Sequence, residues 1–208
     1  MKKFITFEGG EGTGKSTQAK LLSKSLSSIN ENNLLTREPG GTKVSDKIRK
    51  ILVEDKNSNI SSDVEFLLIY ASRHQHLKEK IIPSLKEKTV ICDRYIHSTI
   101  SYQFDIKNFA KKLDFFHQNF AFNLMPDLTI LLDLAPDIGL KRSLKIKNKE
   151  TRFENKDKIY HEKIRKNFLK LSKKYKNMHK IDASLSKKVV HKKIIDHLNK
   201  LLFFKRKL

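Results

Sequence analysis

The segment at residues 9–16, with the sequence GGEGTGKS, constrains the fold of this chain more than any other. It follows a strand-like apolar run at residues 3–8 and leads into residues 15–28, where apolar residues recur at helical spacing. A glycine, four residues and then Gly-Lys-Ser between a strand and a helix predict a loop whose backbone N–H groups surround phosphate oxygens. The alternative interpretation is a glycine-rich turn with an exposed lysine. We favour a site for ATP or GTP, because the whole pattern occurs in the right context.

The residues of this loop differ in what they contribute. Gly9, Gly12 and Gly14 allow a close approach of the backbone that a side chain would block. Lys15 can reach the β- and γ-phosphates of a nucleotide, and the hydroxyl group of Ser16 can hold Mg²⁺. The predicted ATP-binding residues are Gly9, Gly10, Glu11, Gly12, Thr13, Gly14, Lys15, Ser16 and Thr17.

Length and composition predict one globular domain in a reducing compartment. The chain has 208 residues, of which 38% are hydrophobic, and no apolar run is long enough to span a membrane. The N-terminal residues lead directly into the first expected strand, so we expect no signal peptide and no membrane partner. The single cysteine, Cys92, excludes an internal disulfide bond and agrees with a cytoplasmic location. The eight histidines do not show the spacing of a metal site.

The formal net charge of +21 is concentrated in the last third of the chain. Residues 141–208 contain 24 Lys and Arg residues against 6 Asp and Glu residues, a net charge of +18. One interpretation is a surface that binds nucleic acid through phosphate contacts. The other is a nucleotide-binding enzyme whose helices carry solvated lysines. We favour the second and expect no specific nucleic-acid partner, because no nucleic-acid-binding module is recognisable in the sequence.

Strand-like and helix-like segments alternate along the chain, a pattern typical of a parallel sheet with helices on both faces. The fold class is therefore α/β, with a single domain over residues 1–208 and ligands at the carboxyl ends of the strands. We expect five strands, at residues 3–8, 33–37, 89–93, 127–134 and 178–182. We expect helices near residues 15–28, 44–54, 63–87, 108–120, 136–145, 157–174 and 186–204.

Two polar clusters directly follow expected strands. The sequence TREPGGT follows the second strand, and Pro39 with two glycines forms a rigid bend that holds Arg37 and Glu38 at the sheet edge. A plain turn with a surface contact between Arg37 and Glu38 is the alternative. Asp93 ends the third strand and suits a magnesium-water shell or a general base, while Arg94 can clamp a phosphate. A buried ion pair between Asp93 and Arg94 is the alternative there.

Two further segments point to the same edge of the sheet. Arg73 lies four residues after Ile69 on an expected helix, so both side chains share one face. Residues 142–154 are rich in Arg and Lys and contain few apolar residues. Such a segment suits a flap that closes over phosphates and excludes water, and it equally suits a solvated charged loop. The sequence leaves both interpretations open.

With these clusters in order, the chain resembles the thymidylate kinase family over nearly its whole length. The phosphate loop alone is shared by a very large superfamily, whereas REPGGT and DRY followed by YQ are far more specific. The resemblance implies a P-loop NTPase fold with a short basic lid and transfer of the γ-phosphate of ATP to dTMP, giving dTDP and ADP. It also implies Mg²⁺ and a homodimer. The matching segments are FEGGEGTGKST at 7–17, REPGGT at 37–42, DRY at 93–95, ST at 98–99, YQ at 102–103, PDLT at 126–129 and RFE at 152–154.

The resemblance also implies roles for individual residues. Ser16 and Asp93 would hold the metal, partly through water, and Glu11 would approach the sugar and phosphate of the acceptor. Arg73 would hydrogen-bond the thymine ring, and the family has a cis peptide bond before Pro39. The implied catalytic residues are Glu11, Lys15, Asp93, Arg94, Arg142 and Arg152. The implied dTMP-binding residues are Arg37, Glu38, Pro39, Arg49, Phe66, Ile69, Arg73, Arg94, Thr99, Tyr102 and Gln103. Among these, Arg37, Arg49 and Arg94 would bind the acceptor phosphate, Thr99 and Gln103 the polar edge of the base, and Tyr102 the deoxyribose.

Two positions refine the resemblance. Gly12 stands where some thymidylate kinases carry an arginine, which is similar to the bacterial type, in which lid arginines, here Arg142 or Arg152, would supply the transition-state cation. Ile69 stands where the family usually has an aromatic residue that stacks on thymine, with Phe66 one turn earlier. Lysines also replace several lid arginines, which loses bidentate phosphate geometry.

Three other functions are compatible with parts of this pattern. Another nucleoside or nucleoside-monophosphate kinase would share the phosphate loop, the lid and the Asp-Arg pair. An ATP-dependent nucleic-acid-binding protein would use the basic C-terminal third. A structural protein with a vestigial loop is the least favoured, because Lys15, Ser16, Asp93 and Arg94 are all intact.

Overall fold

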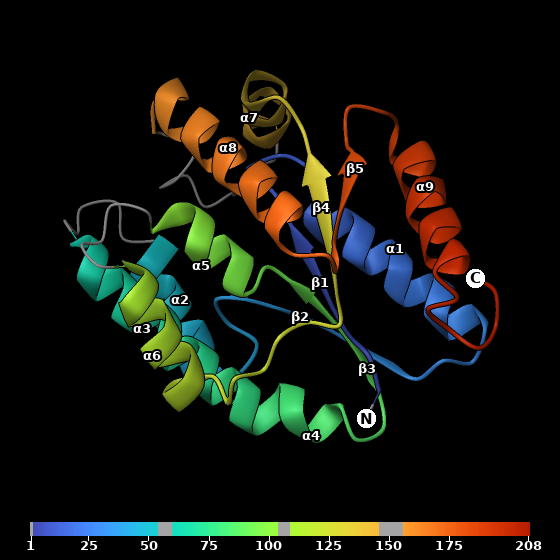
Figure 1. The fold of residues 1–208 in the computed structure, drawn as a ribbon, viewed down its shortest axis with the longest axis horizontal. Helices are drawn as coiled ribbons and strands as arrows, with labels where there is room; N and C mark the ends of the chain where they lie inside the picture. The colour runs from blue at the N-terminus through green and yellow to red at the C-terminus, as the bar shows by residue number, and fades with distance from the viewer. Residues whose placement is uncertain (1, 54–59, 104–108, 146–155) are drawn as a thin grey trace.

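The computed structural model describes residues 2–53, 60–103, 109–145 and 156–208 of the chain. Arg152 and most of the expected lid lie outside these ranges. Five strands form one parallel sheet in the order β2-β3-β1-β4-β5 (Figure 1). All five expected strands are confirmed to within one residue at each end. Their bounds are β1 Phe4–Glu8, β2 Asn33–Arg37, β3 Thr89–Asp93, β4 Leu128–Asp133 and β5 Met178–Asp182.

The apolar content of each strand agrees with its place at the centre or at the edge of the sheet. β1 has the sequence FITFE, and all five of its residues are buried, because neighbouring strands and both helical layers cover it. β2 and β5 have one buried residue each, with the others half-buried or exposed, and they lie at the two edges of the sheet. Strands buried on both faces have continuous apolar runs, so the most apolar strands occupy the centre.

Helices cover both faces of the sheet (Figure 1). On one face, α1 (Lys15–Ser28) packs against α9 (Lys187–Lys200), and their apolar side chains share a core with Ile5 and Phe7 of β1. On the other face lie α3 (Ser62–His76), α5 (Ile96–Tyr102), α6 (Phe109–Phe120) and α8 (Lys158–Lys174). In addition, α2 (Lys43–Val53) packs on α3, and α7 (Pro136–Leu144) packs on α8. No helix in the described ranges is both long enough and apolar enough to cross a membrane.

The helix expected at residues 63–87 is confirmed as a continuous helical segment over residues 62–84, but it is not one regular α-helix. α3 ends at His76 and continues as a π-helical segment, η1 (Leu77–Ile81), before the short α4 (Ile82–Ser84). The backbone N–H of Ile82 donates to the carbonyl oxygen of Leu77, five residues back. Pro83 has no N–H group to continue the regular α-helical ladder, which accounts for the break at this point. Two further differences are that α9 ends at Lys200 rather than near residue 204, and that α5 was not expected.

Candidate active site

The phosphate loop lies between β1 and α1, at the carboxyl end of the central strand. Gly9, Gly12 and Gly14 have φ values of 142°, 65° and 90°. The loop also packs closely against α7, since a Cβ atom on Gly12 would lie 1.8 Å from the carbonyl oxygen of Gly139. The predicted close approach is confirmed at Gly9 and Gly12, where a Cβ atom would meet the carbonyl oxygens of Leu132 and Gly139. At Gly14 a Cβ atom would meet no atom within 4 Å, so only its positive φ favours glycine there.

Lys15 opens α1 and folds back over the loop. Its Nζ atom donates to the carbonyl oxygen of Gly10 at 2.6 Å, and the side chain is nearly buried. Burial, and then the positive charge of Arg94, lower the pKa of the Lys15 ammonium group to about 8. A phosphate group is the ligand that would restore a strongly favoured positive charge here, because it supplies the opposite charge at hydrogen-bond distance.

The donor set beside Lys15 fits an oxygen-preferring divalent cation. The hydroxyl group of Ser16 donates to Oδ2 of Asp93, so a hydroxyl oxygen from the first turn of α1 and a carboxylate oxygen from the end of β3 meet at one point. Mg²⁺ prefers such oxygen ligands and completes its shell with water and nucleotide phosphates. Within the described part of the chain no group of three His, Cys, Asp or Glu side chains could hold a metal alone. The nucleotide itself would therefore supply part of the shell.

Arg94 joins the phosphate loop to the segment after β3. It has a φ of 71°, in the left-handed region, and its guanidinium group lies 5.0 Å from the ring centre of Tyr102. Nη2 donates to Oε1 of Glu11 at 2.7 Å, and Nη1 donates to the carbonyl oxygen of Gly9 and to Oγ of Ser98, both at 3.1 Å. The acid that Arg94 contacts is thus Glu11. The alternative of an ion pair between neighbouring Asp93 and Arg94 is not the arrangement found.

A second buried arginine holds the far end of the site. Arg73 is 2% exposed, and its guanidinium carbon lies between the rings of Tyr70 and Tyr95, at 5.0 Å and 4.8 Å from their centres. Its Nε donates to Oε2 of Glu38 at 2.7 Å, and Nη2 donates to Oγ1 of Thr99 at 3.0 Å. Nη1 is buried and has no partner among the residues that the structure describes. The sequence had left open a surface contact between Arg37 and Glu38. The structure instead pairs Glu38 with Arg73, and this ion pair is buried.

Gln103 contributes a matching acceptor. Its Nε2 donates to Oε1 of Glu65 at 2.7 Å, which fixes the orientation of the amide because a carboxylate only accepts. Oε1 of Gln103 is buried and, in the described ranges, has no hydrogen-bond partner. Two buried polar atoms with opposite hydrogen-bonding character, Nη1 of Arg73 and Oε1 of Gln103, therefore lack partners in one site. Such atoms cost free energy unless a ligand or water pairs with them.

One cavity of about 440 Å³ connects the phosphate loop with this polar pair. It does not include Phe66, which is buried against Tyr70 and Phe116 in the core and thus departs from its predicted place in the dTMP site. Ile69 does line the cavity. The predicted residues that it brings together are Glu11, Gly12, Gly14, Lys15, Ser16, Thr17, Arg37, Glu38, Pro39, Arg49, Ile69, Arg73, Asp93, Arg94, Thr99, Tyr102, Gln103 and Arg142. Sequence reasoning did not assign Leu52, Val53, Glu65, Tyr95 and Ser98, which also line it.

Of the two arginines expected to act from the lid, Arg142 belongs to the described residues. Arg142 belongs to α7, lines the cavity and donates to the carbonyl oxygens of Ala183 and Ser184, at 2.8 Å and 2.9 Å. Its guanidinium group is thus tied to the turn after β5. Arg152 lies outside the described residues. The peptide bond before Pro39 is cis, as the resemblance implied.

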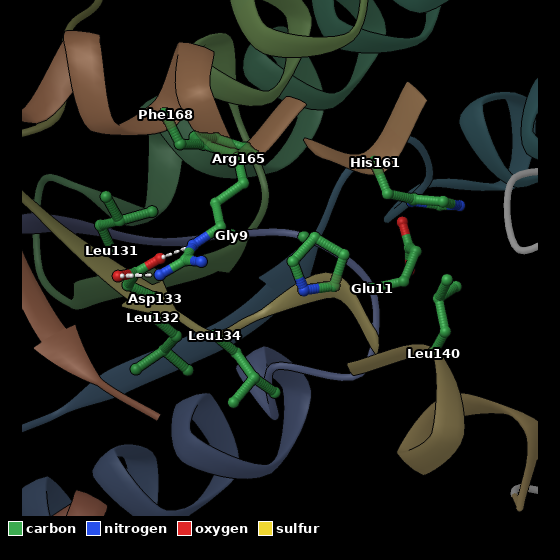
Figure 2. A pocket seen from close by; sticks show the side chains of 12 residues that line it. Gly9, Glu11, Leu131, Leu132, Asp133, Leu134, Leu140, His161, Arg165 and Phe168 are labelled. Atoms are coloured by element: carbon green, nitrogen blue, oxygen red, sulfur yellow. Dashed lines mark hydrogen bonds and ion pairs between the residues drawn. The ribbon is translucent and has the colours of Figure 1, made fainter. Parts of the chain in front are cut away.

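A smaller pocket of about 20 Å³ lies beside the phosphate loop, lined by Gly9, Glu11 and residues of β4 and α8 (Figure 2). Arg165 of α8 donates through Nε and Nη2 to the two carboxylate oxygens of Asp133, at 2.7 Å and 3.1 Å (Figure 2). This bidentate pair fixes α8 to the carboxyl end of β4. No sequence pattern had singled out Arg165 or Asp133.

A phosphate loop at the central strand of a β2-β3-β1-β4-β5 sheet, open to a second polar cavity, defines a P-loop NTPase fold with room for a phosphate acceptor. The sequence pattern of thymidylate kinases matches residues 7–194. The chain therefore belongs to the thymidylate kinase family, whose members are ATP-using nucleoside monophosphate kinases.

Individual relatives agree over nearly the full length. A thymidylate kinase of Acholeplasma laidlawii is 39% identical over 96% of this chain and all of its own length. That of Rickettsia africae is 42% identical over 94% of this chain and 97% of its own. A crystal structure of thymidylate kinase from Ehrlichia chaffeensis superposes with a TM-score of 0.75 at 33% identity, covering 95% of this chain and 98% of that one.

Proposed function

We propose that this chain transfers the γ-phosphate of ATP to dTMP, giving dTDP and ADP, as a step in dTTP synthesis. The observation that carries the proposal is the pair of buried polar atoms without partners, Nη1 of Arg73 and Oε1 of Gln103, in the cavity that begins at the phosphate loop. Thymine presents an acceptor at O4 beside the N3–H donor. A donor from Arg73 and an acceptor from Gln103 match that edge, so dTMP pairs both atoms.

The rest of the cavity suits two phosphate groups. Lys15 and the loop backbone are assigned to the ATP phosphates, and Arg37, Arg49 and Arg94 to the phosphate of the acceptor. An acceptor held there can attack the γ-phosphorus in line, so catalysis rests on positioning and charge neutralisation without a covalent intermediate. Ser16 and Asp93 would hold Mg²⁺, which offsets the charge of the phosphates when it is bound.

The cation for the transition state comes from the lid in this proposal. Gly12 has no side chain that could supply it, and Arg142 already lines the cavity. Release of Arg142 from the carbonyl oxygens of Ala183 and Ser184, or approach of Arg152, would bring a guanidinium group to the phosphates. A cation at that point is worth about 10³–10⁵ in rate. Alanine at both arginines should therefore lower turnover steeply, and unchanged turnover would exclude the lid mechanism.

A homodimer in the cytoplasm completes the proposal. Three phenylalanines at α6 and the turn after it are 56% (Phe115), 41% (Phe120) and 50% (Phe122) exposed, and such an apolar surface is typical of an interface. A second copy of this chain is the proposed occupant. Sedimentation of Phe115→Asp should give a monomer where the parent chain gives a dimer. Leu202→Asp, at an 80% exposed leucine far along the chain, is the matched control and should leave the dimer intact.

The test of the activity is ADP release with ATP, Mg²⁺ and each nucleoside monophosphate in turn. We expect turnover with dTMP that is lost in Lys15→Ala, because that variant removes the charge facing the phosphates. Turnover with UMP, CMP or AMP in place of dTMP would keep the kinase and overturn the base assignment. ATP hydrolysis stimulated by DNA, without any acceptor phosphorylation, would instead favour a nucleic-acid-dependent ATPase.

A further inference from the structure

A buried histidine stands behind the arginine that faces the base. His76 ends α3 one turn after Arg73 and is fully buried. Its Nδ1 lies 3.2 Å from Oε1 of Glu38, and its Nε2 lies 2.7 Å from Oγ1 of Thr36. Because Glu38 also binds Arg73 through Oε2, the contacts form an unbroken chain from Thr36 through His76 and Glu38 to Arg73.

We propose that His76 is a positioning residue of the acceptor site, which orients Glu38 and, through it, the guanidinium group of Arg73 toward the base of the bound nucleotide. This inference rests on the proposed function for the identity of the nucleotide. His76 does not line the cavity, so it is not placed to touch the nucleotide. Its effect passes through Glu38.

The protonation states give each contact a direction. Burial alone would raise the pKa of Glu38, but the charge of Arg73 and the hydrogen bond from His76 bring it below the ordinary value, so Glu38 is ionised. An ionised carboxylate only accepts, hence Nδ1 of His76 carries the proton and donates to Oε1. Without this donor, Oε1 would be a buried charged oxygen lacking its partner, and the carboxylate would turn to find another. Arg73 would then lose the acceptor that fixes its Nε.

The segment around Glu38 is shaped to fit the imidazole ring. A Cβ atom on Gly41 would lie 2.4 Å from Nε2 of His76, so only glycine leaves room for the ring at this point. The same helical stretch also holds the loop on either side of His76. The backbone N–H of Gly40 donates to Oγ of Ser72 at 3.2 Å, and Nζ of Lys80 donates to the carbonyl oxygen of Gly41 at 3.0 Å. Ser72 and Lys80 thus hold the backbone of the loop, whereas His76 and Arg73 hold the carboxylate of Glu38.

Two amide substitutions distinguish the role of Nδ1 of His76 from that of Nε2. In His76→Asn the amide nitrogen can take the place of Nδ1 and keep the donor to Glu38, whereas in His76→Gln it reaches the place of Nε2 and loses that donor. We expect the KM for dTMP to rise about tenfold in His76→Gln, with kcat and the KM for ATP changed less than about twofold. His76→Asn should stay within about threefold of the parent KM. His191→Gln, which alters a contact with Ser25 between α1 and α9, is the control and should change neither constant.

A spectroscopic signal tests the same contact without turnover. The Nε–H group of Arg73 is buried and hydrogen-bonded to Glu38. Its proton, observed in a ¹H–¹⁵N NMR spectrum, should therefore exchange slowly with solvent in the parent chain and in His76→Asn. We expect this signal to be lost in His76→Gln. An unchanged KM and a retained signal in His76→Gln would overturn the inference. Equal effects of the two substitutions would overturn it as well, and so would a fall in kcat together with a rise in the KM values for both substrates. Absence of dTMP turnover in the parent chain would overturn the proposed function alone, because the Arg73 signal still decides the role of His76.

Discussion

At the scale of single residues, a buried carboxyl group links the central strand to Arg94. Glu8 ends β1 and accepts from the backbone N–H of Tyr95 at 2.9 Å and from Oγ of Ser98 at 2.5 Å. Ser98 in turn accepts from Nη1 of Arg94 at 3.1 Å. Complete burial raises the pKa of the Glu8 carboxyl group to about 7, against smaller opposing effects of Ser98 and Arg94. Glu8 therefore titrates near neutral pH while it holds the segment that carries Arg94.

The first prediction concerns the stability of the fold as Glu8 titrates. Between about pH 4.5 and about pH 7 the folded protein keeps a proton on Glu8 that the unfolded chain has released. The stabilisation from this group is therefore complete below about pH 4.5 and is lost as the pH rises through about 7. Relative to Glu8→Gln, the free energy of unfolding of the parent chain should fall by about 3 kcal/mol across this range. Urea unfolding at a series of pH values measures the difference.

A surface glutamate provides the control for this titration. Glu87 is exposed, and Glu87→Gln should follow the parent chain at every pH. A difference between parent and Glu8→Gln that does not vary with pH would show that Glu8 has an ordinary pKa. A difference that grows in favour of the parent as the pH rises would show that its pKa is lowered, contrary to the effect of burial.

The residues that could be predicted from the sequence are those that follow strands. Lys15 and Ser16 open the helix that follows β1, Asp93 ends β3 and Arg94 follows it; because parallel strands bring their carboxyl ends together, a shared site follows from chain order alone. Glu8, His76 and Arg165 could not be found in this way. Each acts through a contact with a residue at least 30 positions away, and no local spacing signals such a pair.

At the scale of elements, two glycines allow α7 to touch the phosphate loop. A Cβ atom on Gly139 would lie 2.3 Å from the carbonyl oxygen of Glu11, and one on Gly12 would meet the backbone of Gly139. Both obstacles are backbone atoms, which cannot turn aside as a flexible side chain can. The helix that carries Arg142 is therefore seated on the loop that is assigned to the ATP phosphates, and the two must move together.

The second prediction follows from this contact. Gly139→Ala should push α7 away from Glu11, at a cost of about 1–3 kcal/mol in the free energy of unfolding. Because Glu11 belongs to the phosphate loop, a displacement of about 1 Å should also lower kcat/KM by up to about 10²-fold. Chemical unfolding and steady-state kinetics measure the two effects.

A substitution at the neighbouring residue, Ile138, distinguishes crowding at Gly139 from a general effect of mutation on α7. Ile138 is 43% exposed, and Ile138→Ala should change the free energy of unfolding by less than about 0.5 kcal/mol and leave the kinetics unchanged. Normal stability and kinetics in Gly139→Ala would mean that α7 and the loop can separate freely, and the proposed coupling of Arg142 to the loop would then be wrong.

The elements show where sequence patterns succeed and where they fail. The five strands were predicted closely, because parallel strands buried on both faces have continuous apolar runs bounded by polar residues. Residues 63–87 carry one uninterrupted helical pattern, so the change to a π-helix at Leu77 was not visible. α5 was missed because it has only seven residues, and most of its buried positions are polar. Its buried polar residues are His97, Thr99 and Ser101. Of these, Thr99 lines the cavity, whereas His97 contacts Thr129 and Tyr175 in the interior.

At the scale of the whole molecule, the charge distribution is the largest feature that the site does not explain. The net charge is +21, and the excess lies in the part of the chain that forms α8, β5 and α9. Three exposed lysines of α8, Lys166, Lys170 and Lys173, lie on one face of the helix, at spacings of four and three residues. Like charges at these spacings repel one another at low ionic strength.

The last prediction is that salt stabilises this fold. Raising NaCl from about 20 mM to about 300 mM shortens the screening length from over 20 Å to about 6 Å, which reduces repulsion between neighbouring lysines. A gain of about 1 kcal/mol would raise Tm by about 2–4 °C for a chain of this size. Replacing Lys166, Lys170 and Lys173 with glutamine lowers the net charge from +21 to +18 and should raise Tm at low salt while reducing its dependence on salt. A Tm that falls with salt in the parent chain would mean that ion pairs such as Arg165–Asp133 outweigh the repulsion, and the triple variant would then be no more stable than the parent.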